Sequence, residues 1–381
     1  MSATWQECAS ALADEVTHAQ SRWREAVRAT PRHLFVPRWW EREESGPRLV
    51  DGPSDPAGWM RAAYRDTSLV TRLGTLHADR AEPGDRPEGA PSSSATLPSL
   101  VVQMFRHVRP DEGMDVLDVG TGSGYSSALL CHRFGAHRVT SVDVDPYLTE
   151  AARERLAEVG HRPEVATLDA TGNLPGSTYD RIVAMVSVPR VPAAWLTALR
   201  PGGRLVCTIT GTGMVIGADK TADGGAAGRV EPHQAGFMGV RHGADYPPRL
   251  LARFPHARDE DGEEVTVGRY PVLDVDRAWD VKTQLFLAVP GVETHYEEAE
   301  QGERRTAWLL HADGSWARAE ARRDDPPTVH QGGPRRLWNT LERIRHLFNT
   351  QGSLGVYGFP VRIAPDGVCH IAWGDWAVTL E

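Results

Sequence analysis

The stretch from Val116 to Tyr125 most constrains what this chain can fold into. It reads V-L-D-V-G-T-G-S-G-Y, so a short apolar run is followed by three glycines in the spacing G-x-G-x-G. The apolar run predicts a buried strand, and the glycines predict a sharp turn whose backbone can approach a ligand closely. Because residues 126–134 are again largely apolar, we expect a helix there, with free N–H groups at its start.

A second strand is predicted at residues 138–142 and is followed directly by Asp143. A carboxylate at the end of the second strand, about 20 residues beyond a glycine loop, is the usual partner of a ribose diol. A glycine loop alone is weak evidence. Strand, loop, helix, strand and acid together predict a site for a nucleoside-containing cofactor.

The loop differs from two common nucleotide sites. Dinucleotide folds usually carry G-x-G-x-x-G and phosphate-binding P-loops carry a lysine, and neither feature occurs here. An acidic strand end suits a cationic ligand. S-adenosyl-L-methionine carries a sulfonium and an α-amine, so it is the predicted cofactor; the alternative is a Rossmann-like unit without a cofactor.

Strands and helices continue to alternate beyond the loop. The predicted elements are a helix at 147–159, a strand at 163–168 ending at Asp169, a strand at 179–186, a short helix at 195–199 and a strand at 204–209. This alternation predicts a parallel, doubly wound α/β sheet, whose ligands gather at the carboxyl ends of its strands. Asp118, Asp143 and Asp169 would all lie at that edge.

Upstream, apolar periodicity predicts one helix over residues 5–29 and a structureless loop over 81–94. Residues 92–98 read S-S-S-A-T-L-P, and Pro98 suits the first position of a helix. A hydroxyl before it would cap that helix, and the amides at the helix start attract anions. The segment is therefore either a plain cap or a carboxylate-binding turn.

The chain changes character near residue 247. We expect a loop at 211–228, strands at 266–273 and 284–289, a hairpin at 306–321, a helix at 334–348, and a hairpin formed by 355–363 and 368–373. Two domains are therefore predicted, 1–248 and 249–381, the second an α+β module. Its tryptophans could bind a peptide, although core packing is the commoner role; they are Trp279, Trp308, Trp316, Trp338, Trp373 and Trp376.

Composition excludes several functional classes. The chain has 381 residues, 40% apolar and 24% charged, as in soluble globular proteins, and a net charge of −9 does not favour binding to nucleic acid. Because no apolar segment resembles a signal or a membrane span, a cytoplasmic protein without a membrane partner is expected. The four cysteines form no C-x-x-C pair, so neither a metal site nor a disulfide framework is predicted.

Residues 15–210 resemble the protein-L-isoaspartate O-methyltransferase family. The matching motifs occur in order: Thr30–Pro37 (T-P-R-H-L-F-V-P), Ala63-Tyr64 with Asp66 and Gly74, Ser94–Pro98 (compare T-I-S-x-P), Val116–Tyr125, Asp143, Asp169, Tyr179–Val186 and Leu199–Leu205 (L-R-P-G-G-R-L). The resemblance implies a class I methyltransferase with a Rossmann-like α/β sheet that uses S-adenosyl-L-methionine.

The resemblance also implies a set of site residues. The cofactor-binding residues would be Asp118, Gly120, Thr121, Gly122, Ser123, Gly124, Tyr125, Asp143, Val144, Asp169 and Ala170. Within this set Asp118 would contact the methionine part, Asp143 the ribose and Asp169 the adenine. Ser93, Ser94 and Thr96 would orient the substrate carboxylate and are the predicted catalytic residues. A carboxylate is ionised at neutral pH, so neither a strong general base nor a metal is expected.

Three departures separate the chain from simple repair enzymes of this family. The serine-rich segment reads S-A-T-L-P, Leu168 is followed by D-A-T-G instead of D-G, and residues 249–381 form an extension. The layout, together with P-R-R-L-W-N-T-L-E at Pro334–Glu342, resembles a subgroup encoded with ribosomal peptide maturation systems of the graspetide (ATP-grasp) or lanthipeptide type.

That subgroup resemblance implies methylation of an aspartate side chain in a modified, including a macrocyclic, precursor peptide. The methyl ester would then cyclise to an aspartimide. Three alternatives stay open: repair of isoaspartyl proteins, a peptide-binding scaffold with a vestigial cofactor fold, and methylation of a small molecule, because the fold does not fix the acceptor.

Overall fold

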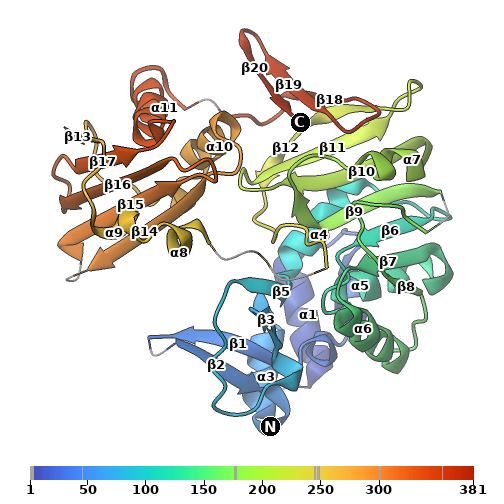
Figure 1. The fold of residues 1–381 in the computed structure, drawn as a ribbon. Helices are drawn as coiled ribbons and strands as arrows, with labels where there is room; N and C mark the ends of the chain where they lie inside the picture. Colours follow the sequence, from blue (N-terminus) through green and yellow to red (C-terminus); the bar gives the residue numbers. More distant parts are fainter. Residues whose placement is uncertain are drawn as a thin grey trace. The chain divides into compact units, whose positions relative to one another are not determined.

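The computed structural model describes residues 4–44, 46–175, 178–243, 246, 249–299, 302–353 and 355–381. The chain divides into two compact units (Figure 1). Unit 1 consists of Met1–Thr210, Val215–Tyr246 and Gly358–Glu381, and unit 2 of Gly211–Met214 and Pro247–Tyr357. The predicted boundary after residue 248 falls on Pro248, which lies outside the described residues.

Unit 1 begins with helices and a small antiparallel sheet. Their bounds are α1 (Trp5–Val16), α2 (Arg24–Ala29), α3 (Pro56–Ala63), β1 (Arg38–Glu43), β2 (Gly46–Asp51), β3 (Leu69–Leu73), β4 (Leu76–His77) and β5 (Pro91–Ala95). The strand order is β2-β1-β3-β4, and β5 also pairs with β3. The single helix predicted over 5–29 is wrong, because the backbone at Thr17 is extended and ends α1.

The main sheet of unit 1 has ten strands in the order β20-β19-β18-β12-β11-β10-β9-β6-β7-β8. Its strands are β6 (Val116–Val119), β7 (Val139–Asp143), β8 (Glu164–Thr167), β9 (Tyr179–Val188), β10 (Leu199–Ile209), β11 (Met214–Lys220), β12 (Ala226–Gln234), β18 (Pro360–Ile363), β19 (Cys369–Trp373) and β20 (Trp376–Leu380). The helices connecting this part of the chain are α4 (Pro98–Val108), α5 (Tyr125–Phe134), α6 (Pro146–Glu158) and α7 (Ala193–Ala198).

The five strands β8, β7, β6, β9 and β10 run parallel, which confirms the predicted α/β sheet. Helices α1, α2, α4 and α5 share one apolar core with this sheet, represented by Leu12, Val27, Phe105, Leu129 and Val183. The core thereby holds the carboxyl ends of β6 and β7 in fixed positions.

The loop predicted at 211–228 is wrong, because this region contains all of β11 and the start of β12. Strand β11 pairs with β10, with Cys207 opposite Ile216. A Cβ at Gly217 would lie 2.3 Å from Glu231 Oε1 and 2.5 Å from Arg204 Nη2. Glycine occurs in this strand because a buried ion pair passes close to its backbone.

The hairpin predicted at the end of the second domain instead extends the main sheet. Strand β18 pairs with β12, with Ala226 opposite Ile363, and β19 and β20 follow it as a hairpin. Residues from Gly358 onward therefore belong to unit 1. The sequence around β18 does not predict β12 as its partner, because pairing between strands far apart in the chain depends on tertiary contacts.

Unit 2 is a five-stranded antiparallel sheet with the order β13-β17-β16-β15-β14. Its elements are β13 (Glu264–Val267), β14 (Glu293–Ala299), β15 (Arg304–Leu310), β16 (Trp316–Arg322), β17 (Thr328–Gly332), α8 (Leu250–Arg253), α9 (His256–Asp259), α10 (Trp279–Ala288) and α11 (Leu337–Gln351). The predicted hairpin at 306–321 and helix at 334–348 are confirmed. The strand predicted at 284–289 is wrong, because this apolar run lies in α10 and packs against α11.

Core packing accounts for three tryptophans of unit 2. Trp308, Trp316 and Trp338 are all buried, whereas the exposed Trp373 belongs to unit 1. These three indoles are therefore not available to bind a peptide.

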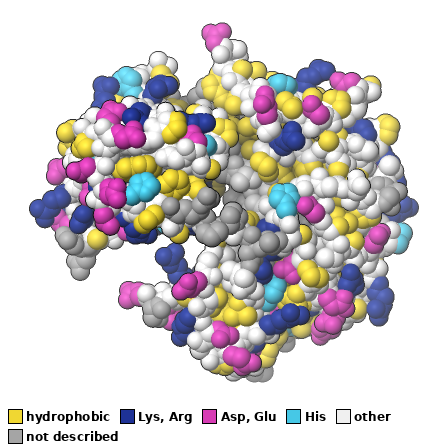
Figure 2. Space-filling view, viewed as in Figure 1, with side chains coloured by type: hydrophobic (Ala, Val, Ile, Leu, Met, Phe, Trp, Pro, Cys, Tyr) yellow, Lys and Arg dark blue, Asp and Glu magenta, His cyan; other side chains and the backbone are white. Residues whose placement is uncertain are grey.

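Side chains of both charge signs are intermixed on the face drawn in Figure 2. Among the helices of the described residues, none is both long and apolar enough to cross a membrane.

Candidate functional site

A cavity of about 360 Å³ opens at the carboxyl ends of β6, β7 and β9 in unit 1. This volume is typical of sites for small ligands, about 300–1,000 Å³. Its walls include strand β5, the start of α4, the glycine loop, the ends of β7 and β9, and residues 236–241 after β12. Of the predicted site residues, the lining includes Ser93, Ser94, Thr96, Gly120, Thr121, Gly122, Ser123, Tyr125, Asp143, Val144 and Ala170.

The glycine loop has a backbone that other residues rarely adopt. Gly120, Gly122 and Gly124 have φ values of +92°, +50° and +90°. A Cβ on Gly120 would lie 2.8 Å from Val186 Cγ1, and one on Gly124 would lie 3.1 Å from Ala152 Cβ. The loop therefore requires glycine for both its conformation and its close packing.

Asp143 lies where β7 ends and lines the cavity. Its Oδ2 accepts a hydrogen bond from the Gly122 amide (3.0 Å), and its Oδ1 accepts one from the Asp145 amide (3.1 Å). Burial raises the pKa of this carboxyl above its ordinary value, while these two hydrogen bonds oppose the rise. Because a carboxylate oxygen can accept two hydrogen bonds, both oxygens can also accept from a ribose diol.

The structure places Asp118 beneath the glycine loop and not among the lining residues. Its Oδ2 accepts hydrogen bonds from Ser126 (2.8 Å) and Ser127 (2.7 Å). Burial raises the pKa of Asp118 to about 6, against the effect of its serine partners. Oδ1 is buried and has no partner within the described residues. Contact between Asp118 and a cofactor amine remains a prediction. The hydrogen bonds to Ser126 and Ser127 indicate that Asp118 supports the glycine loop from below.

Asp169 also lies outside the lining, although its neighbour Ala170 belongs to it. Asp169 Oδ1 accepts a hydrogen bond from the Thr171 amide (2.9 Å), and Oδ2 lies 2.8 Å from Nδ1 of His242. These partners lower the pKa of Asp169, although burial acts in the opposite direction. The adenine contact of Asp169 stays a prediction, and both of its carboxylate oxygens already have protein partners.

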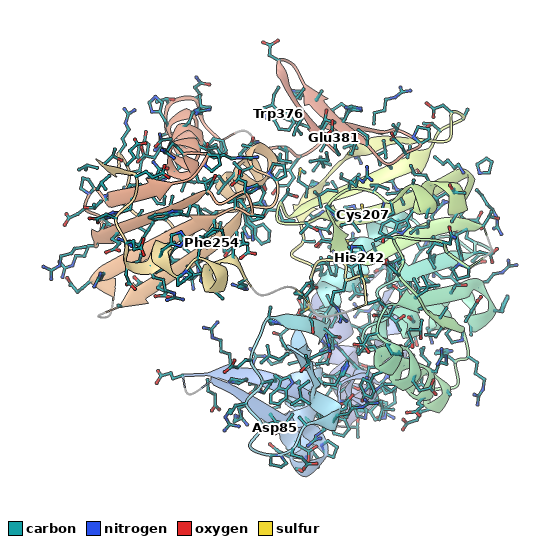
Figure 3. The ribbon with its side chains drawn as sticks, in the orientation of Figure 1. Asp85, Cys207, His242, Phe254, Trp376 and Glu381 are labelled. Atoms are coloured by element: carbon teal, nitrogen blue, oxygen red, sulfur yellow. The ribbon has the colours of Figure 1, made fainter. Side chains whose placement is uncertain are left out.

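Residues 236–241, which we call the roof segment, were not predicted as part of the site. Ser187 at the end of β9 donates to Met238 O and accepts from the Val240 amide, both at 2.8 Å. This pairing holds the roof segment against the sheet next to the cavity. His242, labelled in Figure 3, follows it immediately. No motif marks this segment, because its place depends on backbone pairing with β9.

The three predicted catalytic residues line the cavity, and two of them, Ser93 and Ser94, lie next to the glycine loop. A Cβ on Gly122 would lie 3.6 Å from Ser94 O and 4.0 Å from Ser93 Oγ. Ser93 Oγ accepts a hydrogen bond from Thr71 (2.9 Å), so the Ser93 proton remains available for a ligand. In the described part of the chain, neither the Ser94 nor the Thr96 hydroxyl has a hydrogen-bond partner. These hydroxyls can therefore donate to an anionic group in the cavity.

Two predictions about this wall are wrong. The serines lie in strand β5, with Ser94 opposite Val70 of β3, and not in a turn. No side chain at the N-cap of α4 bonds to the helix; instead Asp66 Oδ1 accepts from the Ser99 amide (2.8 Å). The Asp66 carboxylate is therefore the anion at the start of α4. A ligand carboxylate would then be bound by the hydroxyls of this wall and not by the helix amides.

Arg32, which was identified only as part of a motif, fixes the position of this wall. Its fully buried guanidinium donates to the carbonyls of Thr67 (3.0 Å), Ala95 (3.3 Å) and Thr96 (3.2 Å). It also donates to the carbonyls of Ala63 and Arg65. Burial lowers the pKa of Arg32, and the nearby Tyr125, Asp66 and Tyr64 oppose that change. One side chain therefore joins the end of β5 to residues 63–67.

No cluster of histidine, cysteine and acidic side chains suited to a metal occurs among the described residues. The cavity itself fits a nucleoside-containing cofactor. It combines a glycine cradle that a Cβ would fill with a carboxylate at the β7 end, and Asp143 is the one lining carboxylate of the described residues.

Comparisons with known proteins point to one family. The family model described as Protein-L-isoaspartate(D-aspartate) O-methyltransferase (PCMT) matches residues 87–235. The curated protein-L-isoaspartate O-methyltransferase of Ignicoccus hospitalis is 30% identical over 192 residues, covering 49% of this chain and 82% of that protein. That of Aeropyrum pernix is 32% identical over 206 residues, covering 52% of this chain and 65% of that protein. The chain thus spans just under two thirds of the length of this second relative.

One solved structure named protein-L-isoaspartate O-methyltransferase is similar to almost the whole chain. It has a TM-score of 0.51 and 18% identity, and the match covers 97% of this chain and 99% of that one. At this identity the likeness concerns the fold, and it confirms the predicted class I methyltransferase architecture. Because the match includes most of residues 249–381, that extension does not distinguish this chain from proteins of that name.

Proposed function

Because the chain belongs to the protein-L-isoaspartate O-methyltransferase family, we propose that it methylates the carboxylate of an isoaspartyl residue in a protein or peptide. The methyl donor is S-adenosyl-L-methionine. The observation that carries the proposal is the close approach of β5, which we call the serine strand, to the glycine loop. A Cβ on Gly122 would lie 3.6 Å from Ser94 O and 4.0 Å from Ser93 Oγ. Donor and acceptor sites therefore share one cavity.

The cofactor would be held by the glycine loop and the ends of β7 and β8. Gly120, Gly122 and the amides around them supply a close-fitting backbone, and Asp143 accepts hydrogen bonds from the ribose hydroxyls. Ala170 lines the cavity beyond β8, where the adenine would lie. When bound, the cofactor supplies an electrophilic methyl group on a sulfonium.

The serine strand would hold the acceptor carboxylate. Ser93, Ser94 and Thr96 each have a hydroxyl proton that can be donated to one carboxylate oxygen, which leaves the other oxygen to attack the methyl carbon. The new bond from this oxygen to the methyl carbon would form as the bond from that carbon to sulfur breaks, so the products would be a methyl ester and S-adenosylhomocysteine. Because the carboxylate is already ionised, no proton has to be removed.

The protein therefore contributes positioning and exclusion of water. Neutral hydroxyl donors bind a carboxylate without neutralising it, so the attacking oxygen keeps its charge. Alignment of two bound reactants lowers the barrier by removing the entropic cost of bringing them together. The hydroxyl-lined wall and the roof segment provide both functions.

A narrower reading is methylation of an aspartate in a ribosomally made, modified precursor peptide, followed by closure to an aspartimide. It is supported by the resemblance of Pro334–Glu342, which covers the start of α11, and by the serine-rich segment. Both readings use the same chemistry in the same cavity. They differ in the acceptor residue, so substrate preference separates them.

The test is a methylation assay with two synthetic peptides that differ only in one residue, isoaspartyl or aspartyl. Peptides are incubated with S-adenosyl-L-methionine and analysed by mass spectrometry. Repair predicts gain of one methyl group on the isoaspartyl peptide and none on the aspartyl peptide. Methylation of the aspartyl peptide alone, with subsequent loss of methanol, would instead favour the narrower reading. No methyl gain on any of these peptides would refute the proposed acceptor class.

A further inference from the structure

Asp145, two residues beyond Asp143, is a buried carboxylate that neither the motif nor the proposed chemistry uses. It is 7% exposed and forms the N-cap of α6. Its Oδ1 accepts hydrogen bonds from the amides of Tyr147 (3.0 Å) and Leu148 (3.4 Å). Capping occupies this oxygen and leaves Oδ2 for other partners.

Three basic side chains from different elements surround Oδ2 of Asp145. His77 Nε2 lies at 3.2 Å, Arg241 Nη2 at 3.5 Å and Arg72 Nε at 3.6 Å, and all three side chains are buried. Burial alone would raise the pKa of Asp145, but the hydrogen bond from His77 and the surrounding positive charges lower it to about 2. The carboxylate therefore stays ionised at physiological pH and joins β3, β4 and the residue ending the roof segment.

This cluster connects to both ends of the cavity. On one side Arg72 Nη1 donates to Ser92 Oγ (2.8 Å), and Ser92 precedes the proposed carboxylate-binding residues on β5. On the other side the Asp145 amide donates to Asp143 Oδ1 (3.1 Å), the proposed partner of the ribose. An unbroken series of contacts thus runs from the cofactor end of the cavity to the serine strand.

We propose that Asp145 is a positioning residue through which cofactor binding and peptide binding strengthen each other. The inference rests on the proposed function, because it assumes a ribose at Asp143 and a carboxylate at β5. A ligand that fixes Asp143 also fixes the backbone at Asp145 and the basic side chains that it holds. These in turn fix Ser92 and the roof segment, and such coupling between two sites is reciprocal.

Asp79, which lies in the segment Ala78–Arg80 and contacts the same helix, offers a matched control. Its carboxylate accepts hydrogen bonds from Tyr147 (2.9 Å) and Arg155 (2.5 Å), both on α6. Asp79 thus forms a partly buried ion pair with the helix that Asp145 caps, yet it does not line the cavity. Loss of either carboxylate weakens attachment of α6, but only loss of Asp145 breaks the link to Ser92.

The test measures the Kd of S-adenosylhomocysteine by calorimetry, with and without a saturating isoaspartyl peptide. Wild type is expected to bind at least about 5-fold more tightly when the peptide is present, the low end of common coupling factors. Asp145→Asn should remove this difference, Ser92→Ala should reduce it, and Asp79→Asn should keep the wild-type value. Circular dichroism checks that each variant is folded. If Asp145→Asn does not fold, the coupling measured in Ser92→Ala decides whether the inference holds.

Unchanged coupling in Asp145→Asn would overturn the inference; if that variant does not fold, unchanged coupling in Ser92→Ala would do so. Equal loss of coupling in Asp79→Asn would overturn it too. Wild type that binds both ligands without any coupling would also overturn it, while leaving the proposed function standing. Wild type that binds no S-adenosylhomocysteine would refute the proposed function itself, and the inference with it.

Discussion

The two walls of the cavity are encoded in different ways. The cofactor wall comes from two short stretches around Gly122 and Asp143, whose conformations follow from their own residues. The acceptor wall combines β5 with the roof segment, which lie far apart in the sequence. Its geometry depends on Arg32 and Asp145. Neither residue belongs to the cavity lining, so both act through other residues. One wall of this site can therefore be predicted from a sequence motif, whereas the other depends on tertiary contacts.

The largest effect is expected at Arg32, on the acceptor wall. Arg32→Gln should lower the free energy of unfolding by about 4 kcal/mol, because several buried carbonyls lose their donor, at about 1–3 kcal/mol each. Urea denaturation measures this loss. Arg28→Gln, at an exposed position of α2, is the control and should change stability little. Equal stability of Arg32→Gln and wild type would contradict the role given to this side chain.

Gly120→Ala should next damage the cofactor wall. The added Cβ would lie 2.8 Å from Val186 at a φ of +92°, a conformation that costs a non-glycine residue about 1–3 kcal/mol. Affinity for S-adenosylhomocysteine should fall roughly 100-fold, which corresponds to about 3 kcal/mol. Gly113→Ala is matched for backbone, with φ +78° and no atom within 4 Å of its Cβ, and should retain affinity. Similar cofactor affinities in both variants would remove the glycine loop from the site.

The sequence predicted the cofactor wall well because its determinants are local. Glycines at positive φ and an acid at a strand end need no distant partner, so Gly120 and Asp143 were identified directly. The hydroxyls proposed to bind the acceptor were predicted from family resemblance, but their strand was predicted as a turn because pairing with β3 leaves little local signal. The roof segment and Asp145 were missed for the same reason. Their positions are set by Ser187 and by basic residues elsewhere in the chain.

Asp118 offers a pH test of the support beneath the cofactor wall. Burial raises its pKa from 3.8 to about 6, so between these values the folded chain binds a proton that the unfolded chain has lost. Stability from this group is fully present below pH 3.8 and is lost as the pH rises through 6. The free energy of unfolding of wild type minus that of Asp118→Asn should fall by about 2 kcal/mol between pH 4 and pH 7. A difference that stays flat across this range in urea titrations would contradict the shifted pKa.

Ser94→Ala and Thr96→Ala should affect the acceptor wall alone. Each removes a donor to the substrate carboxylate, which lowers kcat/KM for an isoaspartyl peptide by at least about 10-fold, since a hydrogen bond to a charged group contributes about 1.5–3 kcal/mol. The Kd for S-adenosylhomocysteine should not change. Ser99→Ala, whose side chain lies outside the cavity lining, is the control. Wild-type turnover in both variants would show that this strand does not hold the acceptor.

The smallest effect is expected at His242, the residue that follows the roof segment. Its ion pair with Asp169 has side-chain exposures of 67% and 36%, and exposed pairs contribute at most about 1 kcal/mol. His242→Ala should therefore weaken cofactor binding by less than about 5-fold at low salt, and less again at high salt. A loss of cofactor affinity as large as that expected for Gly120→Ala would contradict this account and make His242 a main determinant of cofactor binding.

The central claim is that a methyl donor on the glycine loop faces an acceptor carboxylate on β5. A crystal structure of the protein with S-adenosylhomocysteine and an isoaspartyl peptide tests it most directly. We expect the ribose hydroxyls on Asp143 and the peptide carboxylate within hydrogen-bond distance of Ser94 or Thr96, with one oxygen directed at the sulfur. Adenosine bound elsewhere, or a carboxylate that does not contact β5, would contradict the account.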